Sequence, residues 1–241
     1  MLRIDKYLAD CGIGTRSEVK KYIKAKQITV NGEVVVKPEQ KIDENADVIC
    51  FKGQPITYEK YVYYLLHKPA GCVTAKQDNV HKTVMEYFPD EIRTKDIAPV
   101  GRLDLDTEGL LLFTNDGPLT HHLLSPTHHI PKTYYAVLNK EVPEMAVELF
   151  KNGVDIGDDK PTLPAELTIL PVSTYENGED VYSAELTISE GRFHQVKRMF
   201  EAVGCTVIYL KRLSMGSLTL GNLEKGEYKK LTEEEIIELQ N

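Results

Sequence analysis

The sequence lacks the features that mark secreted, membrane and cysteine-bound metal proteins. Its four cysteines are scattered along 241 residues without a CxxC pair, which indicates neither a disulfide framework nor a cysteine zinc site. No apolar run approaches the roughly 20 residues of a membrane span, and the N-terminus has no signal-peptide pattern. We therefore expect a cytoplasmic protein without a membrane partner.

An excess of positive charge is also missing. The formal net charge is −8, which argues against a protein that coats nucleic acid in general. A local basic face is still possible, and local charge decides binding. Apolar residues make up 41% of the chain, enough for the ordinary core of one large domain or two smaller ones.

A metal-binding pattern and a nucleotide-binding loop are absent as well. Histidines gather at His121, His122, His128 and His129. The adjacent pairs lack the one-face helical spacing of a metal-binding helix, and Pro126 interrupts the segment. We predict neither a bound metal nor a cofactor.

The first positive feature of the sequence is a basic N-terminal segment. The spacing of Ile4, Tyr7 and Leu8 predicts one helix, and Thr15 or Ser17 can cap a second. An RNA backbone can meet the cations of these helices, although a lysine-rich face is by itself more often simply solvated. These candidate RNA-binding residues are Arg3, Lys6, Arg16, Lys20, Lys21 and Lys24.

A hairpin follows over residues 27–36, with Asn31-Gly32 as its turn. Two basic helices followed by a Val-Asn-Gly hairpin resemble the S4-type RNA-binding domain. The resemblance implies contact with RNA shape and phosphates rather than with bases. We place this domain at residues 1–56, with a linker near residues 52–55.

The rest of the chain is organised around residues 101–113, which read GRLDLDTEGLLLF. A turn with three carboxylates and two glycines precedes an apolar strand. Gly101 and Gly109 permit backbone conformations and close approaches that a side chain would resist. A carboxylate beside such a strand loses water and needs a cation to stay ionised. We interpret Asp104 as chemical and Asp106 as a structural turn residue.

This string closely resembles the central motif of RsuA-type pseudouridine synthases, which modify uridines in ribosomal RNA. The resemblance covers nearly the whole chain and implies that Asp104 is the catalytic nucleophile. In the KTY string at residues 132–134, it implies that Tyr134 stacks on the target base. It also implies RNA contact or loop structure for the histidine segment. Arg102 is a candidate for flipping the base or holding a phosphate.

A second motif, GRFHQVKRMF, begins at Gly191. Val196, Met199, Phe200 and Val203 lie on one helix face, and Gly204 is the expected C-terminal stop. The helical phase places Lys197 near the apolar stripe and Arg198 towards solvent or phosphate. The family pattern likewise gives Lys197 the position that pairs with the catalytic aspartate. We assign substrate binding to Arg102, His194 and Arg198.

Other segments have strand or helix patterns. Strands are expected at residues 61–66, 110–113, 132–138, 163–170, 180–188, 206–210 and 218–220, with a turn at 176–179. Helices are expected at 81–88, 119–124 and 143–150, and residues 233–238 read as an acidic tail.

Together these features predict an α+β protein. We expect an S4-like domain and, at residues 60–236, a pseudouridine synthase catalytic domain with a mixed, mostly antiparallel sheet. The expected reaction isomerises one uridine of 16S rRNA, free or within a small-subunit assembly intermediate, and the protein is expected to be a monomer. The covalent route and elimination to a glycal stay open. So do a 23S rRNA synthase, a non-catalytic ribosome assembly factor, and a retaining glycosidase that pairs Asp104 with Asp106 or Glu108.

Overall fold

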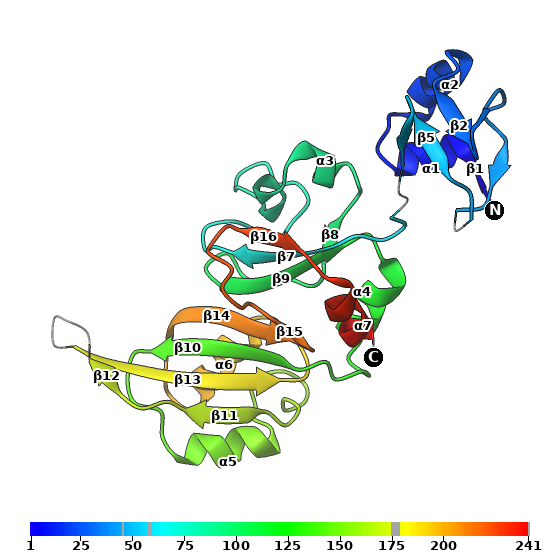
Figure 1. Ribbon diagram of the computed structural model, residues 1–241. Coiled ribbons are helices and arrows are strands. Elements are labelled where there is room, and N and C mark those ends of the chain that lie inside the picture. The colour runs from blue at the N-terminus through cyan, green and yellow to red at the C-terminus, as the bar shows by residue number, and fades with distance from the viewer. Residues whose placement is uncertain (45, 57–58, 175–178, 241) are drawn as a thin grey trace. The chain divides into compact units, whose positions relative to one another are not determined.

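The computed structural model describes residues 1–44, 46–56, 59–174 and 179–240 (Figure 1). The chain forms two compact units, the first from residues 1–62 and 89–97 and the second from residues 63–88 and 98–241. No helix in the described part of the chain is both long and apolar enough to cross a membrane.

The first unit contains the two predicted N-terminal helices. They are α1 (Ile4–Asp10) and α2 (Arg16–Lys24), and the short α3 (Asp90–Arg93) also belongs to this unit. Thr15 rather than Ser17 caps α2: its hydroxyl accepts from the Glu18 backbone N–H, and Glu18 accepts in return from the Thr15 N–H.

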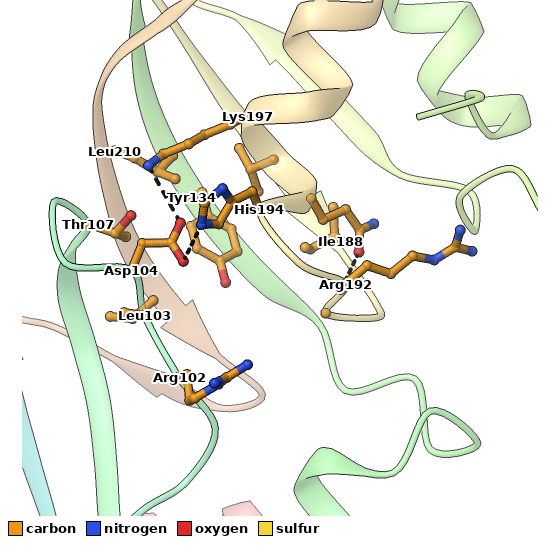
Figure 2. A pocket seen from close by; sticks show the side chains of 13 residues that line it. Arg102, Leu103, Asp104, Thr107, Tyr134, Ile188, Arg192, His194, Lys197 and Leu210 are labelled. Carbon is orange, nitrogen blue, oxygen red and sulfur yellow. Dashed lines mark hydrogen bonds and ion pairs between the residues drawn. The ribbon is translucent and has the colours of Figure 1, made fainter. Parts of the chain in front are cut away.

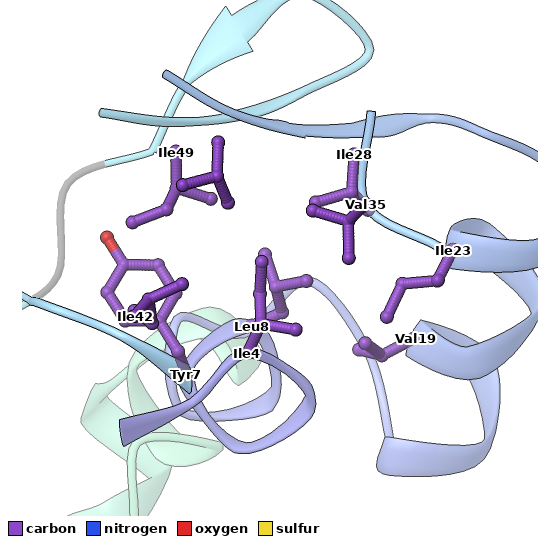
Figure 3. Packing of buried hydrophobic residues seen from close by; sticks show 10 residues of the cluster. Ile4, Tyr7, Leu8, Val19, Ile23, Ile28, Val35, Ile42 and Ile49 are labelled. Atoms are coloured by element: carbon purple, nitrogen blue, oxygen red, sulfur yellow. The ribbon is translucent and has the colours of Figure 1, made fainter. Parts of the chain in front are cut away.

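Small sheets complete the first unit. Strand β1 (Leu2–Arg3) pairs with β4 (Lys41–Ile42), and a second sheet has the order β3-β2-β5-β6. The bounds of that sheet's strands are Ile28–Val30 for β2, Glu33–Val34 for β3, Ile49–Phe51 for β5 and Gln54–Pro55 for β6. Asn31 and Gly32 both have positive φ, so the predicted hairpin turn is confirmed. Side chains of α1, α2 and the strands, among them Ile4, Leu8 and Ile28, pack into one core (Figure 3).

The second unit is built on one large sheet of order β11-β13-β10-β14-β9-β7-β16, with β8, β12 and β15 as short additions. Pairing between β9 and β14 is parallel and the other recorded strand pairs are antiparallel, so the predicted mixed, mostly antiparallel sheet is confirmed. The strands are β7 (Tyr63–Lys68), β8 (Ala98–Pro99), β9 (Glu108–Thr114), β10 (Lys132–Leu138), β11 (Glu166–Ile169), β12 (Ser173–Thr174), β13 (Asp180–Ile188), β14 (Val207–Met215), β15 (Leu218–Thr219) and β16 (Tyr228–Lys230).

Helices flank this sheet. They are the 3₁₀ helix η1 (Val84–Tyr87), α4 (Gly117–Leu124), α5 (Met145–Asn152), α6 (Gln195–Ala202) and α7 (Glu233–Gln240). In Figure 1, α5 runs beside β11 and α6 lies against the part of the sheet that contains β10 and β14. Gly204 has φ 78° and follows α6 as the expected helix stop.

Several predicted elements differ in the structure. Residues 81–88 contain only the single turn η1, α5 begins two residues after Pro143, and the strand expected at 163–170 is confined to β11. The turn expected at 176–179 lies mostly outside the described residues. The acidic tail is the helix α7, because Thr232 and Glu235 cap each other's backbone N–H groups and Leu239 is buried.

Candidate active site

Asp104 lies on the loop that enters β9, and every residue of β9 is buried. The preceding residue is fixed on both sides: Leu103 N–H donates to the Thr74 hydroxyl at 3.1 Å, and that hydroxyl donates to the Leu103 carbonyl at 2.7 Å. Gly71 N–H donates to the Leu105 carbonyl at 2.8 Å. The loop therefore holds Asp104 from a backbone that is itself hydrogen-bonded.

Lys68, at the end of β7, is a support for this loop that the sequence pattern did not reveal. Its side chain is fully buried, and its Nζ donates to the carbonyls of Asp104 at 3.0 Å and Thr107 at 2.8 Å. Burial lowers the pKa of Lys68, while nearby acidic groups oppose that shift. Lys68 begins the string Lys-Pro-Ala-Gly, and nothing in that string indicates these distant partners.

Gly109 confirms the expected close approach of two backbones. It pairs with Arg212 where β9 and β14 run parallel, and a Cβ on Gly109 would lie 2.2 Å from the Arg212 carbonyl oxygen. Its φ of 109° also disfavours any side chain. This contact fixes the Asp104 loop beside the strand that carries Leu210.

Two basic side chains converge on Asp104 in a small cavity of about 90 Å³ (Figure 2). Lys197 Nζ lies 3.5 Å from Asp104 Oδ2, and His194 Nε2 lies 3.5 Å from Asp104 Oδ1. The Asp104 side chain is 32% exposed, so solvent and a substrate can reach it. The structure thus brings Lys197 to Asp104, as the helical phase predicts.

Asp106 forms an ion pair with Lys197 in addition to its place in the turn. Lys197 Nζ donates to both Asp106 carboxylate oxygens, at 2.7 and 2.8 Å. Burial opposes the charged form of Asp106, but the hydrogen bond and charge of Lys197 outweigh it and lower the pKa of Asp106. Asp106 accepts a hydrogen bond from its own backbone, as a turn residue does, but its carboxylate also holds the lysine that faces Asp104.

Tyr134 and Leu210 form part of the apolar wall of the cavity. Strand β10, at the predicted position, alternates: Tyr134 and Ala136 are buried on one face, and Tyr135 and Val137 lie on the other. In the neighbouring strand β14, Arg212 lies opposite Tyr134 and Leu210 lies opposite Ala136. Tyr134 and Leu210 therefore lie on the same face of the sheet, the face that lines the cavity. Figure 2 shows Tyr134 beside Asp104 and His194.

Arg102 lines the cavity from the Asp104 loop and is exposed. Among the residues that the structure describes, no ion pair is recorded for its guanidinium. Its neighbour across the cavity, Arg192, is by contrast bound to Glu190 at 3.0 Å and to the carbonyls of Lys160 and Pro161.

Arg198 is the one substrate-binding candidate that the structure places differently. It points away from Asp104, as predicted, but its guanidinium does not face solvent. It pairs with Asp158 and donates to the carbonyls of Ile156 and Phe193. Strand and helix periodicity say nothing about a loop such as residues 156–158, which is why this partner was missed.

The basic N-terminal candidates are mostly free for a partner. Lys6, Arg16, Lys20, Lys21 and Lys24 are exposed on α1 and α2. Arg3 is different, because it donates two hydrogen bonds to the buried carboxylate of Asp5, at 3.0 and 2.9 Å. That hydrogen bond is the main reason that the pKa of Asp5 is low.

The alternative chemistries have little support in this geometry. In the described part of the chain, no group of three or more His, Cys, Asp or Glu side chains is arranged to hold a metal. A glycosidase would need a second carboxylate facing Asp104 across a sugar. Glu108 is instead buried and bound to Tyr209 at 2.7 Å and Lys225 at 2.9 Å, and Asp106 is held by Lys197.

Comparison with known proteins identifies the class. The family described as RNA pseudouridylate synthase matches residues 62–202, and the S4 domain matches residues 2–48. The chain belongs to the RNA pseudouridylate synthase family, whose members are isomerases that convert uridine to pseudouridine. The S4 match confirms the resemblance of the N-terminal helices and hairpin.

Individual relatives cover the whole chain. An uncharacterised RNA pseudouridine synthase of Bacillus subtilis is 41% identical over 98% of this chain and 97% of its own. The ribosomal small subunit pseudouridine synthase A of Haemophilus influenzae is 39% identical over 99% of both chains. A solved structure titled as a pseudouridylate synthase is 39% identical, with a TM-score of 0.68 over 99% of this chain and 100% of the other.

Proposed function

We propose that this protein converts one uridine of 16S rRNA to pseudouridine. The observation that carries the proposal is the convergence on one small cavity of Asp104, Tyr134 and Lys197, which come from a loop, a strand and a helix. The names of full-length relatives, such as the small-subunit synthase of Haemophilus influenzae, support 16S rRNA as the substrate. The reaction then takes place in the cytoplasm, where the protein acts as a monomer.

The chemistry is an isomerisation that conserves every atom of the uracil. The N1–C1′ bond breaks, the base rotates, and a C5–C1′ bond forms; C5 then loses a proton and N1 gains one. Asp104 acts at the sugar, as a nucleophile or as a base that leads to a glycal. The base must first leave its stack, at a cost of a few kcal/mol.

Each neighbour of Asp104 has a separate role in this proposal. Lys197 places its ammonium group opposite the Asp104 carboxylate, at 3.5 Å. Tyr134 stacks on the flipped uracil, which holds the base without choosing its sequence. Arg102 occupies the vacated place in the RNA or holds a phosphate, and His194 contacts the bound nucleotide beside Asp104.

The two domains divide the work. We assign residues 1–56 to RNA shape and phosphate contact through the exposed cations of α1 and α2, and residues 60–236 to catalysis. The S4 family match supports the first assignment. The substrate is free 16S rRNA or a small-subunit assembly intermediate.

The test is a map of pseudouridine across 16S and 23S rRNA in a strain that lacks the gene. One 16S pseudouridine should disappear, and it should return with the wild-type gene but not with Asp104→Asn. Loss of a 23S pseudouridine instead would identify a large-subunit synthase. Unchanged maps together with a subunit assembly defect would identify a non-catalytic assembly factor.

A further inference from the structure

An exposed aromatic ring stands beside the catalytic cavity, and the proposed chemistry leaves it without a role. Phe193 is 70% exposed although it is one residue from His194. Its ring stacks on the His194 ring, with centroids 3.8 Å apart and planes at 18°. His194 in turn approaches the Asp104 carboxylate at 3.5 Å. A stack of two rings therefore begins next to the reacting carboxylate, and its Phe193 ring is exposed.

The segment that carries Phe193 is held in place by hydrogen bonds. Its carbonyl accepts a hydrogen bond from Arg198 Nη1 at 3.1 Å. On either side, Gln195 Oε1 accepts from the Arg192 backbone N–H at 2.9 Å, and Gln195 Nε2 donates to Glu190 at 3.0 Å. The backbone is thus fixed while the ring is presented to solvent.

The backbone that presents the ring is also strained. His194 has φ 48° and ψ 32°, a left-handed conformation that non-glycine residues seldom adopt. Such conformations persist where surrounding structure enforces them, and they gather at binding sites. Here the strained residue is the one that stacks beneath Phe193 and faces Asp104.

A second, larger cavity opens on this surface. Its volume is about 750 Å³, within the range of ligand sites, and it shares Arg102, Asp104 and His194 with the catalytic cavity. Phe193 lines this cavity together with the exposed apolar side chains of Leu105 and Leu124, each 42% exposed. Because the two cavities share lining residues, the larger one offers a path for the rest of a polynucleotide whose target base occupies the small one.

We propose that Phe193, backed by His194, is a stacking platform for the nucleobase next to the flipped uridine in the same RNA strand. This inference rests on the proposed function. A ring that is 70% exposed suits any base, because every base offers a π-face to an aromatic side chain. Arg102, exposed between the two cavities, meets the phosphate that joins the two nucleotides.

The test compares Phe193→Ala with wild-type protein for binding of a 16S rRNA transcript at fixed salt. Loss of one base stack should weaken binding by about tenfold to a hundredfold. Phe193→Trp should retain wild-type affinity, because it keeps a stacking surface. Met145→Ala is the matched control: it removes an apolar side chain that is 69% exposed and lies outside both cavities, and it should leave binding unchanged.

A second arm locates the base. Once the modified uridine is mapped, RNA fragments carry an abasic nucleotide on one side of it or the other. At one of the two positions the abasic change should cost the wild-type protein about tenfold or more and Phe193→Ala almost nothing. The two changes are then coupled, as partners in a stack must be.

Three results would overturn the platform: Phe193→Ala binding within twofold of wild type, an equal loss in Met145→Ala, or equal abasic penalties in wild type and variant at both positions. A wild-type protein that forms no pseudouridine in any rRNA would contradict the proposed function instead. In that case the transcript-binding comparison still decides whether Phe193 holds RNA. An apolar peptide that competes with RNA for binding only when Phe193 is present would assign the ring to a protein partner and also reject the inference.

Discussion

The cations of the two units are arranged in opposite ways. On α1 and α2 of the first unit, Lys6, Arg16, Lys20, Lys21 and Lys24 are exposed, and no carboxylate within 4 Å is recorded for them among the described residues. Around the cavity of the second unit, Arg102 is exposed. Lys197, Arg192 and Arg198, by contrast, have side chains only 20–25% exposed, and each of these three holds at least one carboxylate.

This difference indicates that the exposed cations contribute to RNA affinity, whereas the partly buried cations fix the geometry of the site. Exposed charges act through a screened field, so what they contribute to RNA binding falls as salt rises. Charges that are partly buried and hydrogen-bonded are screened much less, and they fix the positions of their partners. The first set is suited to hold RNA near the protein, and the second set is suited to keep Asp104, Asp106 and the Phe193 turn in place.

The largest expected effect comes from Asp104→Asn. The amide keeps the shape of the side chain but has no negative charge and is a poor nucleophile, so pseudouridine formation should fall below detection. Affinity for 16S rRNA should stay within about threefold of wild type, because the S4 cations are unchanged. Single-turnover assays and equilibrium binding measure the two quantities. Measurable turnover in this variant would remove Asp104 from its assigned role.

The next effect separates two adjacent cations on α6. Lys197→Met should lower the single-turnover rate by about a hundredfold or more, because it removes the charge opposite Asp104. Lys197→Arg should retain part of the rate. Arg198→Met should instead weaken RNA binding, since Arg198 holds the Phe193 carbonyl rather than Asp104. Equal rate losses in the two methionine variants would show that the helix phase selects the wrong cation.

Asp106→Asn is a control for that comparison. Asp106 holds Lys197 at 2.7 Å, so its loss should disturb the lysine without removing it. We expect a decrease in rate of about tenfold or less, well below that of Lys197→Met. A rate as low as that of Asp104→Asn would instead make the pair Asp104 and Asp106 a joint catalytic unit.

Neutralising the exposed set should change affinity and leave chemistry intact. The triple variant Lys20→Gln, Lys21→Gln and Lys24→Gln should bind 16S rRNA more weakly and reduce the slope of log affinity against log salt by about 2. Its single-turnover rate at saturating RNA should equal that of wild type. Binding titrations at several salt concentrations measure the slope. An unchanged slope would mean that α2 does not touch the RNA backbone.

The smallest effect concerns Lys132, a buried cation on the cavity strand. Burial and the neighbouring charge of Arg212 lower the pKa of Lys132 to about 8, against 10.5 for a free lysine. Between these values the unfolded chain binds the extra proton, so the folded state gains stability as pH rises. Lys132→Met lacks this gain, and its free energy of unfolding should therefore fall relative to wild type between pH 8 and 10.5. A constant difference in urea unfolding across that range would contradict the shift.

The sequence predicted those parts of the molecule that depend on local pattern. The Asn31-Gly32 turn, the capped α2, the alternation of β10 and the phase of Lys197 on α6 all follow from periods and turn chemistry over a few residues. Each of these rules acts within one element, which is why each held without knowledge of the fold.

The sequence did not predict contacts between segments that are far apart in the chain. Lys68 reaches the Asp104 loop, and Arg198 reaches Asp158, only because the sheet and its loops bring these residues together. Asp106 looked like a turn residue because its partner Lys197 lies 91 positions away. The stacked Phe193 and His194 pair depends on one left-handed backbone conformation, which no composition or period signals.

The most direct test of these separate roles is the salt dependence of RNA binding and of the rate constant in the wild-type protein. Binding of 16S rRNA and the single-turnover rate constant at saturating RNA are measured over the same range of salt concentrations. We expect affinity to fall steeply with salt while the rate constant stays level, because the charges around Asp104 are paired and partly buried. A rate constant that falls in parallel with affinity would contradict this expectation, since the cavity charges would then be as exposed to screening as those of α2.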